Sequence, residues 1–546
     1  MRGVERGARV ILDARWSITQ GDSRIVLAAY ADNSFDSCVC DPPYGLGTRE
    51  PNVDELVRFL QGEDTLRTGG DFMGRKWLVP SVPLWREVFR VLKPGAYLAA
   101  FSGTRAVDLI MMGIRAAGFE IVDCCSYLYG AGFPKSVNAS KAIDKHFGAV
   151  REVVGERPAR LLFGHLDVGS ATIPTTIPTT PQAQQWDGFG TALKPAHEDI
   201  IIAIKPREGT IAANLLKHGT GVLNVDGCRV GTDWSERSDA WKRSGHSAKP
   251  DADKIAAPAG QGIVCNPAGR WPPNVLFGHA DGCVRVGSRK ARGGAGTDCP
   301  HWPDPCRGHG DAGQCQSGET RHGSPPAGWT PNRTETVDNY DCAPGCPVRL
   351  LDEQSGETIS RPSVRGGSDG YHPATPLGRT DNFSPFNDSG TASRFFPTFQ
   401  YSAKSSRLER EIGCEALPVR SRTDATGRDD DAPGQNNPRA GLRAAGGIRN
   451  AHPCVKPVDV LRWITRLVTP PGGIVLDPFC GSGSGGCAAV AEGFRYAGID
   501  LDADGLGYCD VARARIAWWQ AHPGGPTPEA KEETQLEAAG QRSLFG

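Results

Sequence analysis

The chain has 546 residues, with 61 Lys and Arg against 62 Asp and Glu and a formal net charge of -1 at pH 7. Its length allows two or more domains, and its near-neutral charge excludes binding to nucleic acid through overall positive charge, although a local basic face is enough to contact DNA. Without a long apolar run we expect a soluble chain with no membrane partner. The chain has 17 cysteines but no recognisable secretory segment near Met1, so we expect reduced thiols and a cytoplasmic location.

Strands alternate with helices over the first 150 residues. Apolar runs predict strands at 34–40, 96–101 and 119–125, and helical spacing predicts helices at 84–92 and 106–117. This alternation is typical of a parallel, doubly wound α/β sheet.

The regular pattern fails between residues 151 and 190. The local repeat from Thr172 to Thr180 offers no packing face and is predicted to be a loop. A fully apolar strand is then expected at 199–204.

A large irregular insertion follows, from 231 to 450. The whole chain has 69 Gly and 42 Pro, more than packed elements need, and this segment is rich in both. Ordered islands are expected near 271–277, 348–351 and 395–401, whereas 421–447 has the composition of a disordered segment.

The alternation returns between residues 451 and 520. The expected elements, in order, are a helix at 458–468, a strand at 474–479, a glycine loop and helix ending at Glu492, a strand at 495–499 and a helix at 504–519. The polar tail, 521–546, is predicted to be disordered.

One motif follows the predicted strand at 34–40. Asp41, Pro42, Pro43 and Tyr44 come directly after it, and the two prolines stiffen the loop. This places an acid and an aromatic ring at the carboxyl end of a strand, where open α/β sheets bind their ligands.

A second motif lies between a strand and a helix near the other end of the chain. Asp477 begins it, and its small residues, Gly481 to Gly486, let a ligand approach the backbone closely. Asp500 ends the next strand, where a carboxylate can accept both hydroxyls of a ribose. The glycine spacing also fits a dinucleotide fingerprint, so a nicotinamide oxidoreductase is a rival hypothesis, but it leaves the Pro-Pro-Tyr loop unexplained.

Together, the two motifs and their order resemble the beta group of amino-group DNA methyltransferases, especially phage and prophage members. The resemblance implies a Rossmann-like sheet assembled from both chain ends: a catalytic half at 1–230, a target-recognition insertion at 231–450 and a half at 451–520 that binds S-adenosylmethionine. It assigns catalysis to Asp41, Pro42, Pro43 and Tyr44. It assigns cofactor binding to Asp22, Lys456, Asp477, Phe479, Gly481, Ser482, Gly483 and Asp500.

The implied substrate is a base flipped out of double-stranded DNA. Asp41 and the carbonyl of Pro42 would accept hydrogen bonds from its exocyclic amine, and Tyr44 would stack on its ring. An Asp at the first motif position favours N6 of adenine in this family, with N4 of cytosine as the alternative. Any restriction endonuclease would be a separate chain, and the oligomeric state stays open.

Two short chelating pairs, His279 with Cys283 and Cys342 with Cys346, could hold one structural zinc ion. Thiols without metal are the alternative. Other ligands could come from the residues between the pairs, namely Cys299, His301, Cys306, His309, Cys315 and His322. This site also supports a more distant hypothesis, a non-catalytic, metal-tied DNA-binding protein.

Target recognition is predicted within the insertion, where basic residues occur near aromatic ones. The basic set is Arg285, Arg289, Lys290, Arg292, Lys404, Arg407 and Arg410, and the aromatic set is Phe395, Phe396, Phe399 and Tyr401. These residues either contact DNA or form an ordinary solvated surface.

Overall fold

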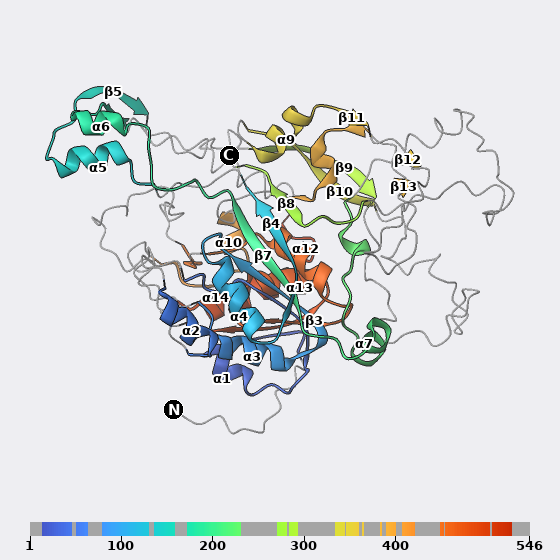
Figure 1. Cartoon of the computed structure of the whole chain (residues 1–546). Helices are drawn as coiled ribbons and strands as arrows, with labels where there is room; N and C mark the ends of the chain where they lie inside the picture. Colours follow the sequence, from blue (N-terminus) through green and yellow to red (C-terminus); the bar gives the residue numbers. More distant parts are fainter. Residues whose placement is uncertain are drawn as a thin grey trace, which may run out of the picture.

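The computed structural model of the chain is built around one large sheet (Figure 1). It describes residues 14–45, 51–63, 79–129, 136–158, 172–230, 270–280, 283–292, 334–343, 346–359, 363–364, 383–384, 389–399, 407–420, 448–452, 454–502 and 505–526. The predicted disorder at 421–447, Tyr401, Lys404, the six intervening Cys and His residues and most of the 521–546 tail lie outside these residues. None of the described helices is both long and apolar enough to cross a membrane.

The 9-stranded sheet combines strands from both chain ends. Its order is β1 (Trp16–Gln20), β17 (Arg495–Asp500), β16 (Ile474–Asp477), β2 (Phe35–Cys40), β3 (Leu92–Ser102), β7 (His197–Ile204), β4 (Glu120–Leu128), β8 (Val275–Gly278) and β15 (Thr398–Phe399). All neighbours pair in parallel except β7, which is antiparallel to β3 and β4. The α/β sheet expected from the sequence is confirmed, but a wholly parallel sheet is not.

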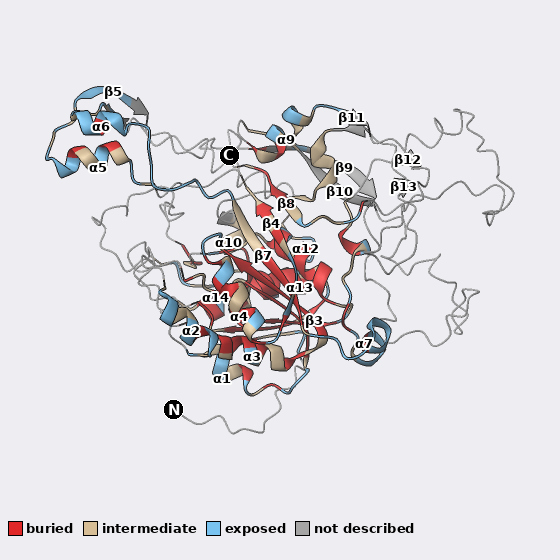
Figure 2. Ribbon diagram, in the orientation of Figure 1, coloured by how far each residue is buried: buried red, intermediate tan, exposed pale blue. Residues whose placement is uncertain are grey.

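Helices cover both faces of the sheet. Successive residues of β3 alternate between two apolar clusters, with Phe101 in one and Ala100 in the other, because side chains of a strand point to opposite faces. The first cluster includes helices α12 (Val458–Val468), α13 (Ser484–Ala491) and α14 (Tyr508–Ala521), and the second includes α1 (Ser23–Leu27), α2 (Val53–Leu60), α3 (Val82–Val91) and α4 (Val107–Ala116). Figure 2 shows the resulting buried centre.

A small appendage stands away from the sheet at the upper left of Figure 1. It contains α5 (Ala139–His146), β5 (Val153–Pro158), β6 (Thr172–Thr176) and α6 (Pro181–Gln185), with β5 and β6 antiparallel. The prediction of a loop over 172–180 is therefore wrong for Thr172–Thr176. The buried carboxylate of Asp144, not apolar spacing, holds this unit together, accepting hydrogen bonds from Arg151, Thr179 and Thr180.

The insertion contributes short elements beside β8. After α7 (Ile211–His218) and the short helix η1 (Asp226–Cys228), these are β9 (Val284–Arg292), β10 (Thr334–Asp341), α9 (Pro347–Ser355), β11 (Thr358–Ile359), β12 (Ser363–Val364), β13 (Phe383–Ser384), β14 (Ser389–Gly390), η2 (Ala392–Phe395) and α10 (Arg407–Glu411). Strands β9 and β10 form an antiparallel pair, as do β11 with β14 and β12 with β13. The ordered islands expected at 271–277 and 348–351 thus fall on β8 and α9, and the described part of the island expected at 395–401 falls on the η2–β15 segment.

Candidate active site and cofactor site

The two sequence motifs follow neighbouring strands. Strand β2 runs parallel to β16, with Cys38 opposite Leu476, so the loops after both strands lie at the same edge of the sheet. Strand β2 is buried along its whole length, as expected of a central strand covered on both faces. The fold therefore brings Asp41 and Asp477 to one edge although they come from opposite ends of the chain.

A network of charged and polar side chains surrounds Asp41. The Tyr44 hydroxyl donates to Asp41 Oδ1 at 2.7 Å. Lys456 Nζ donates to the Tyr44 hydroxyl at 2.9 Å and to Glu198 Oε2 at 2.7 Å, and lies 3.4 Å from Asp41 Oδ1. The three amino protons of Lys456 thus face three oxygen atoms, which fixes the Asp41 carboxylate and the Tyr44 ring relative to each other.

This network controls the protonation of its members. Burial raises the pKa of the Asp41 carboxyl above its ordinary value, and Glu198 adds to the rise, whereas Lys456 opposes it. Burial disfavours charge on Lys456, but Asp41 and Glu198 outweigh it and raise the pKa of the amino group. Lys456 is therefore a permanent cation beside a carboxylate that accepts protons more readily than an exposed one.

The loop after β16 is shaped by glycines. Gly481 and Gly483 have φ angles of 49° and 81°, in the region that favours glycine. A Cβ atom on Gly481 would lie 2.6 Å from His452 Nε2, and one on Gly483 would lie 2.8 Å from the Cα atom of Ala512. Any side chain here would thus push the loop out of its position over α13 and α14.

Arg515 holds this loop from below. Its side chain is fully buried, and its Nη1 donates to the Ser482 carbonyl at 2.7 Å and to Ser484 Oγ at 3.1 Å. Its Nη2 donates to the carbonyl of Glu409 at 3.0 Å, which connects the loop to α10. Phe479, at the other side of the loop, packs edge-on against Trp85 at a centroid distance of 6.1 Å.

Asp477 is buried at the start of the loop. Its carboxylate accepts hydrogen bonds from the Tyr496 hydroxyl at 3.0 Å and from the amide of Phe479 at 3.1 Å. Burial raises its pKa to about 7, and the negative charges of Asp41 and Asp500 add to the rise. A cationic group placed here would be stabilised by this carboxylate, so the site fits a positively charged ligand.

Asp500 and Asp22 lie at the same edge. Asp500 Oδ2 accepts from the Gly481 amide and Oδ1 from the Asp502 amide, both at 2.8 Å. Each oxygen keeps a second lone pair, so the carboxylate can still accept hydrogen bonds from hydroxyl groups. Asp22 caps α1 by accepting from the amide of Arg24, and it also pairs with the guanidinium of Arg24.

Sequence reasoning assigned no role to two residues of this site. Glu198 reaches Lys456 because β7 is antiparallel, which puts its first residues at the edge where the other strands end. The prediction of a wholly parallel sheet hid that position. Gly103 follows β3, and a Cβ atom there would lie 3.0 Å from the Tyr44 ring, so a glycine two residues after a predicted strand was an available signal.

The predicted metal ligands form a separate cluster, whereas α10, which carries two of the predicted DNA contacts, lies against the glycine loop. His279, Cys283, Cys342 and Cys346 come together at the end of β8. Among the predicted basic residues, Arg410 points inward and donates to the carbonyl of His452 at 2.6 Å. The predicted aromatic residues Phe396 and Phe399 pack against Phe277 and against a core cluster, respectively.

A family model for N6 and N4 methyltransferases, described as DNA methylase, matches residues 35–512 of the chain.

Curated relatives match over short segments. The chain is similar to YubD of Escherichia coli strain K12, with 34% identity over 103 residues, and to the DNA adenine methyltransferase YhdJ of the same strain, with 42% identity over 65 residues. These segments are 19% and 11% of this chain and span only 38% and 22% of the relatives.

Solved structures give weak overall superpositions. The PvuII DNA methyltransferase, which is cytosine-N4-specific, matches with a TM-score of 0.34 and 9% identity, covering 97% of this chain and 94% of that chain. The M1.HpyAVI-SAM complex matches with a TM-score of 0.28 and 9% identity, covering 92% and 99%.

Proposed function

The chain belongs to the N6/N4 family of DNA methylases, and from that premise we propose that it methylates the exocyclic N6 amine of an adenine flipped out of double-stranded DNA, with S-adenosylmethionine as methyl donor. One observation carries the proposal: the Asp41–Tyr44 loop and the Asp477–Gly483 loop follow adjacent parallel strands. A base held at the first loop and a methyl donor held at the second would meet at one sheet edge.

The glycine loop, Asp477 and Asp500 are the proposed cofactor residues. S-adenosylmethionine, when bound, supplies a methyl group on a positively charged sulfur. The ionised Asp477 carboxylate would stabilise the cofactor's ammonium group, and Asp500 would accept its ribose hydroxyls through the lone pairs that the Gly481 and Asp502 amides leave unused. Asp22 caps α1 beside this site, and its role in cofactor binding stays a prediction.

Asp41 is the proposed catalytic residue. The lone pair of an exocyclic amine is delocalised into the base, and a hydrogen bond from the amine to Asp41 makes nitrogen a better nucleophile. The bound cofactor would supply the methyl group that this nitrogen takes up. The surplus proton passes to Asp41 or to water, and the raised pKa of Asp41 suits it to that task.

Lys456 and Glu198 position the catalytic loop. Lys456 holds the Tyr44 hydroxyl, and Tyr44 in turn donates to Asp41, so the ring and the carboxylate keep one arrangement. Tyr44 would stack on the flipped base, which contributes about 1–3 kcal/mol toward the cost of extrusion. Lys456, predicted as a cofactor residue, thus serves the catalytic loop in this proposal.

Adenine is the proposed base because an acid stands at the first position of the catalytic motif and because the relative YhdJ is an adenine methyltransferase. N4 of cytosine is the alternative, since its exocyclic amine can use the same acceptor and the same displacement. The two differ in product and not in mechanism.

The test is to incubate the purified chain with mixed-sequence duplex DNA and methyl-labelled S-adenosylmethionine, digest the DNA and identify the labelled nucleoside. We expect N6-methyladenine, with label reduced about 10²–10⁴-fold in Asp41→Ala. Asp54→Ala, in the exposed first turn of α2, is the matched control and should retain full activity. Label in N4-methylcytosine would show that cytosine and not adenine is the methylated base. Full activity in Asp41→Ala would overturn the mechanism.

A chain that binds the cofactor but labels none of a wide range of DNA sequences would overturn the enzymatic proposal. That outcome would favour the non-catalytic, metal-tied DNA-binding protein. Isothermal titration calorimetry with S-adenosylmethionine measures the binding independently of methyl transfer.

A further inference from the structure

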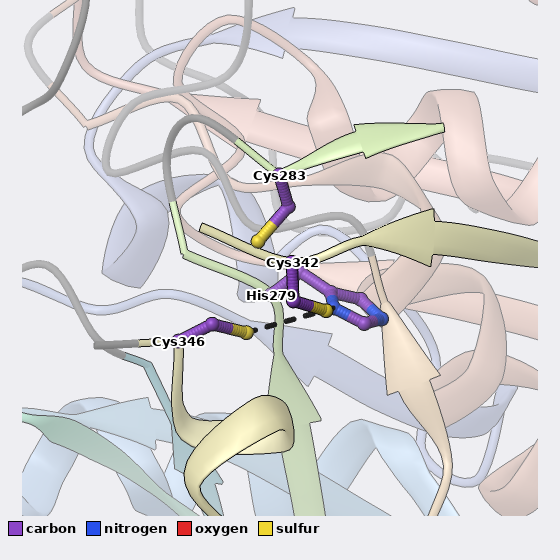
Figure 3. A group of neighbouring side chains, drawn as sticks. All are labelled: His279, Cys283, Cys342 and Cys346. Carbon is purple, nitrogen blue, oxygen red and sulfur yellow. Dashed lines mark hydrogen bonds between the residues drawn. The ribbon is translucent and has the colours of Figure 1, made fainter. Parts of the chain in front are cut away.

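Four side chains converge at the end of β8, far in sequence from the two motifs of the active site. His279 follows β8 directly, Cys283 precedes β9, Cys342 follows β10 and Cys346 precedes α9 (Figure 3). Their possible ligand atoms all lie within 4.8 Å of one another. Cys346, His279 and Cys283 are buried, so the cluster is closed to bulk water on most sides.

The spacing of these atoms matches a tetrahedral metal centre. Zinc bonds of about 2.3 Å to sulfur and about 2.0 Å to nitrogen place neighbouring tetrahedral ligands about 3.5–3.8 Å apart. His279 Nδ1 lies 3.4 Å from Cys342 Sγ and 3.7 Å from Cys346 Sγ. An ion therefore fits between these ligands with little movement of the chain.

The local backbone prepares both chelating pairs in the same way. The Cys283 amide donates to the Ala280 carbonyl at 3.2 Å, and the Cys346 amide donates to the Ala343 carbonyl at 3.1 Å. In each pair, this hydrogen bond joins the second ligand residue to the residue that follows the first. Two segments that lie far apart in the sequence thus each supply two of the four ligands in the same way.

Neighbouring groups also orient the ligands. The Ala343 amide donates to Cys283 Sγ at 3.4 Å. Cys346 is the N-cap of α9, where the helix dipole stabilises negative charge. The Tyr340 ring lies against the His279 ring, with centroids 4.2 Å apart, and holds its orientation.

We propose that His279, Cys283, Cys342 and Cys346 bind one structural Zn²⁺ ion. Three thiolates and one imidazole fill the tetrahedral coordination, so no position remains for water or substrate, as is typical of structural zinc. Among the residues that the structure describes, the buried members of the apolar cluster here are Phe277, Val348 and two of the cysteines. Metal ligation supplies the stability that this small core does not provide.

The position of the site connects it to the proposed function, on which this step rests. Strand β8 runs parallel to β4, so His279 lies at the same sheet edge as Asp41. Strands β3, β7 and β4 lie between β2 and β8 in the sheet. The distance from β2 to β8 is therefore about 19 Å at the ordinary spacing of neighbouring strands. The zinc site therefore holds β8, β15 and α9 at the edge where DNA would bind, on the side of Asp41 away from the cofactor loop.

The first test measures metal content without any reference to activity. The full chain, purified without chelator, should carry one zinc per chain by plasma mass spectrometry. Cys342→Ser with Cys346→Ser should lose it, whereas the matched control Cys414→Ser, a buried cysteine outside the cluster, should keep it. No zinc in the wild-type chain, or full zinc in the double variant, would overturn the proposal.

A second measurement covers the case in which the double variant does not fold. Co²⁺ exchanged into the wild-type chain should give the intense visible bands of a tetrahedral ion and the sulfur-to-cobalt charge transfer of three thiolates. An octahedral spectrum, or no bound Co²⁺, would contradict the site. Neither readout depends on methyl transfer, so the zinc site and the proposed function fail separately.

Zinc removal then tests the role of the site. After treatment with a chelator, we expect the affinity for S-adenosylmethionine to stay within twofold and the affinity for duplex DNA to fall at least tenfold. Restored DNA affinity on adding zinc would complete the test. Loss of cofactor affinity to the same extent would show that the ion holds the whole sheet, and would overturn the assignment to the β8 end.

Discussion

The junction of β2 with β16 and the end of β8 lie at the same sheet edge but are stabilised in different ways. At the junction, helices on both faces contribute two large apolar clusters, and Arg515 fixes the glycine loop from inside the protein. At the end of β8, the buried cluster contains Phe277, Val348 and two cysteines. Packing positions the first region, and in our proposal zinc ligation positions the second.

This difference separates two kinds of dependence. Residues at the junction tolerate little change in volume, because their neighbours are close-packed. In the proposed zinc site, residues at the β8 end depend on the four metal ligands. Removing one ligand should therefore lower the free energy of unfolding by more than the loss of its packing contacts alone. The chain can therefore lose order at the β8 end while the cofactor loop keeps its structure.

The largest predicted effect tests the packing at the junction. Gly483→Ala should lower the free energy of unfolding by about 3 kcal/mol, because the new Cβ atom meets Ala512 at 2.8 Å and the φ angle is 81°. Gly493→Ala is the matched control, since its φ angle of 86° is equally unfavourable but nothing lies within 4 Å. It should cost only about 1–2 kcal/mol.

Urea unfolding followed by tryptophan fluorescence measures both variants. Equal losses in Gly483→Ala and Gly493→Ala would show that the close approach to Ala512 is unimportant. Zinc content should be unchanged in both, because neither position is part of the β8 end.

The next effect concerns Glu198, which joins the catalytic network from β7. Glu198→Gln should lower kcat about 50-fold. The negative charge of Glu198 contributes to the raised pKa of Asp41, so its removal lowers that pKa and makes Asp41 a weaker proton acceptor. The acidic limb of the pH–rate profile should consequently move to lower pH.

A merely structural role for Glu198 would leave that pH limb in place. The KM for S-adenosylmethionine should stay within twofold, since Glu198 does not contact the glycine loop. Glu208→Gln is the control: Glu208 also pairs with a lysine, Lys217, but it is exposed and lies away from Asp41. A change of the same size in Glu208→Gln would contradict the assignment.

The sequence predicted what depends on neighbours along the chain. Asp41 and Asp477 each end an apolar run, so their places at strand ends could be inferred, and the bounds of α12 agree with the predicted 458–468. Glu198 depends on the direction of β7, which no local pattern encodes. Arg410 looked like part of a basic surface, yet its burial, which lowers its pKa to about 10, is decided by contacts with a distant segment.

The same contrast explains the appendage and the metal cluster. Asp144 organises its unit through hydrogen bonds with residues up to 36 positions away, and this leaves no periodic signal. The two chelating pairs were visible as spacings, but the antiparallel pairing of β9 with β10, which sets Val284 opposite Asp341, brings them together. Long-range pairing, and not local propensity, decided both.

The smallest predicted effect concerns pH and the cofactor loop. Burial raises the pKa of Asp477 to about 7, so the ionised form that would bind the cofactor's ammonium group is present above that pH and is lost as the pH falls through it. The affinity for S-adenosylmethionine should thus be about tenfold weaker at pH 6 than at pH 8. Asp477→Asn should bind more weakly and show no such dependence.

Calorimetry offers an independent check of the same residue. Cofactor binding near pH 7 should release about half a proton, because the bound cation forces Asp477 to ionise. Measurements in buffers of different ionisation enthalpy reveal that release, and Asp510→Asn, at an exposed position of α14, should leave it unchanged. Proton release that persists in Asp477→Asn would place the titrating group elsewhere and remove the argument that Asp477 binds the cationic end of the cofactor.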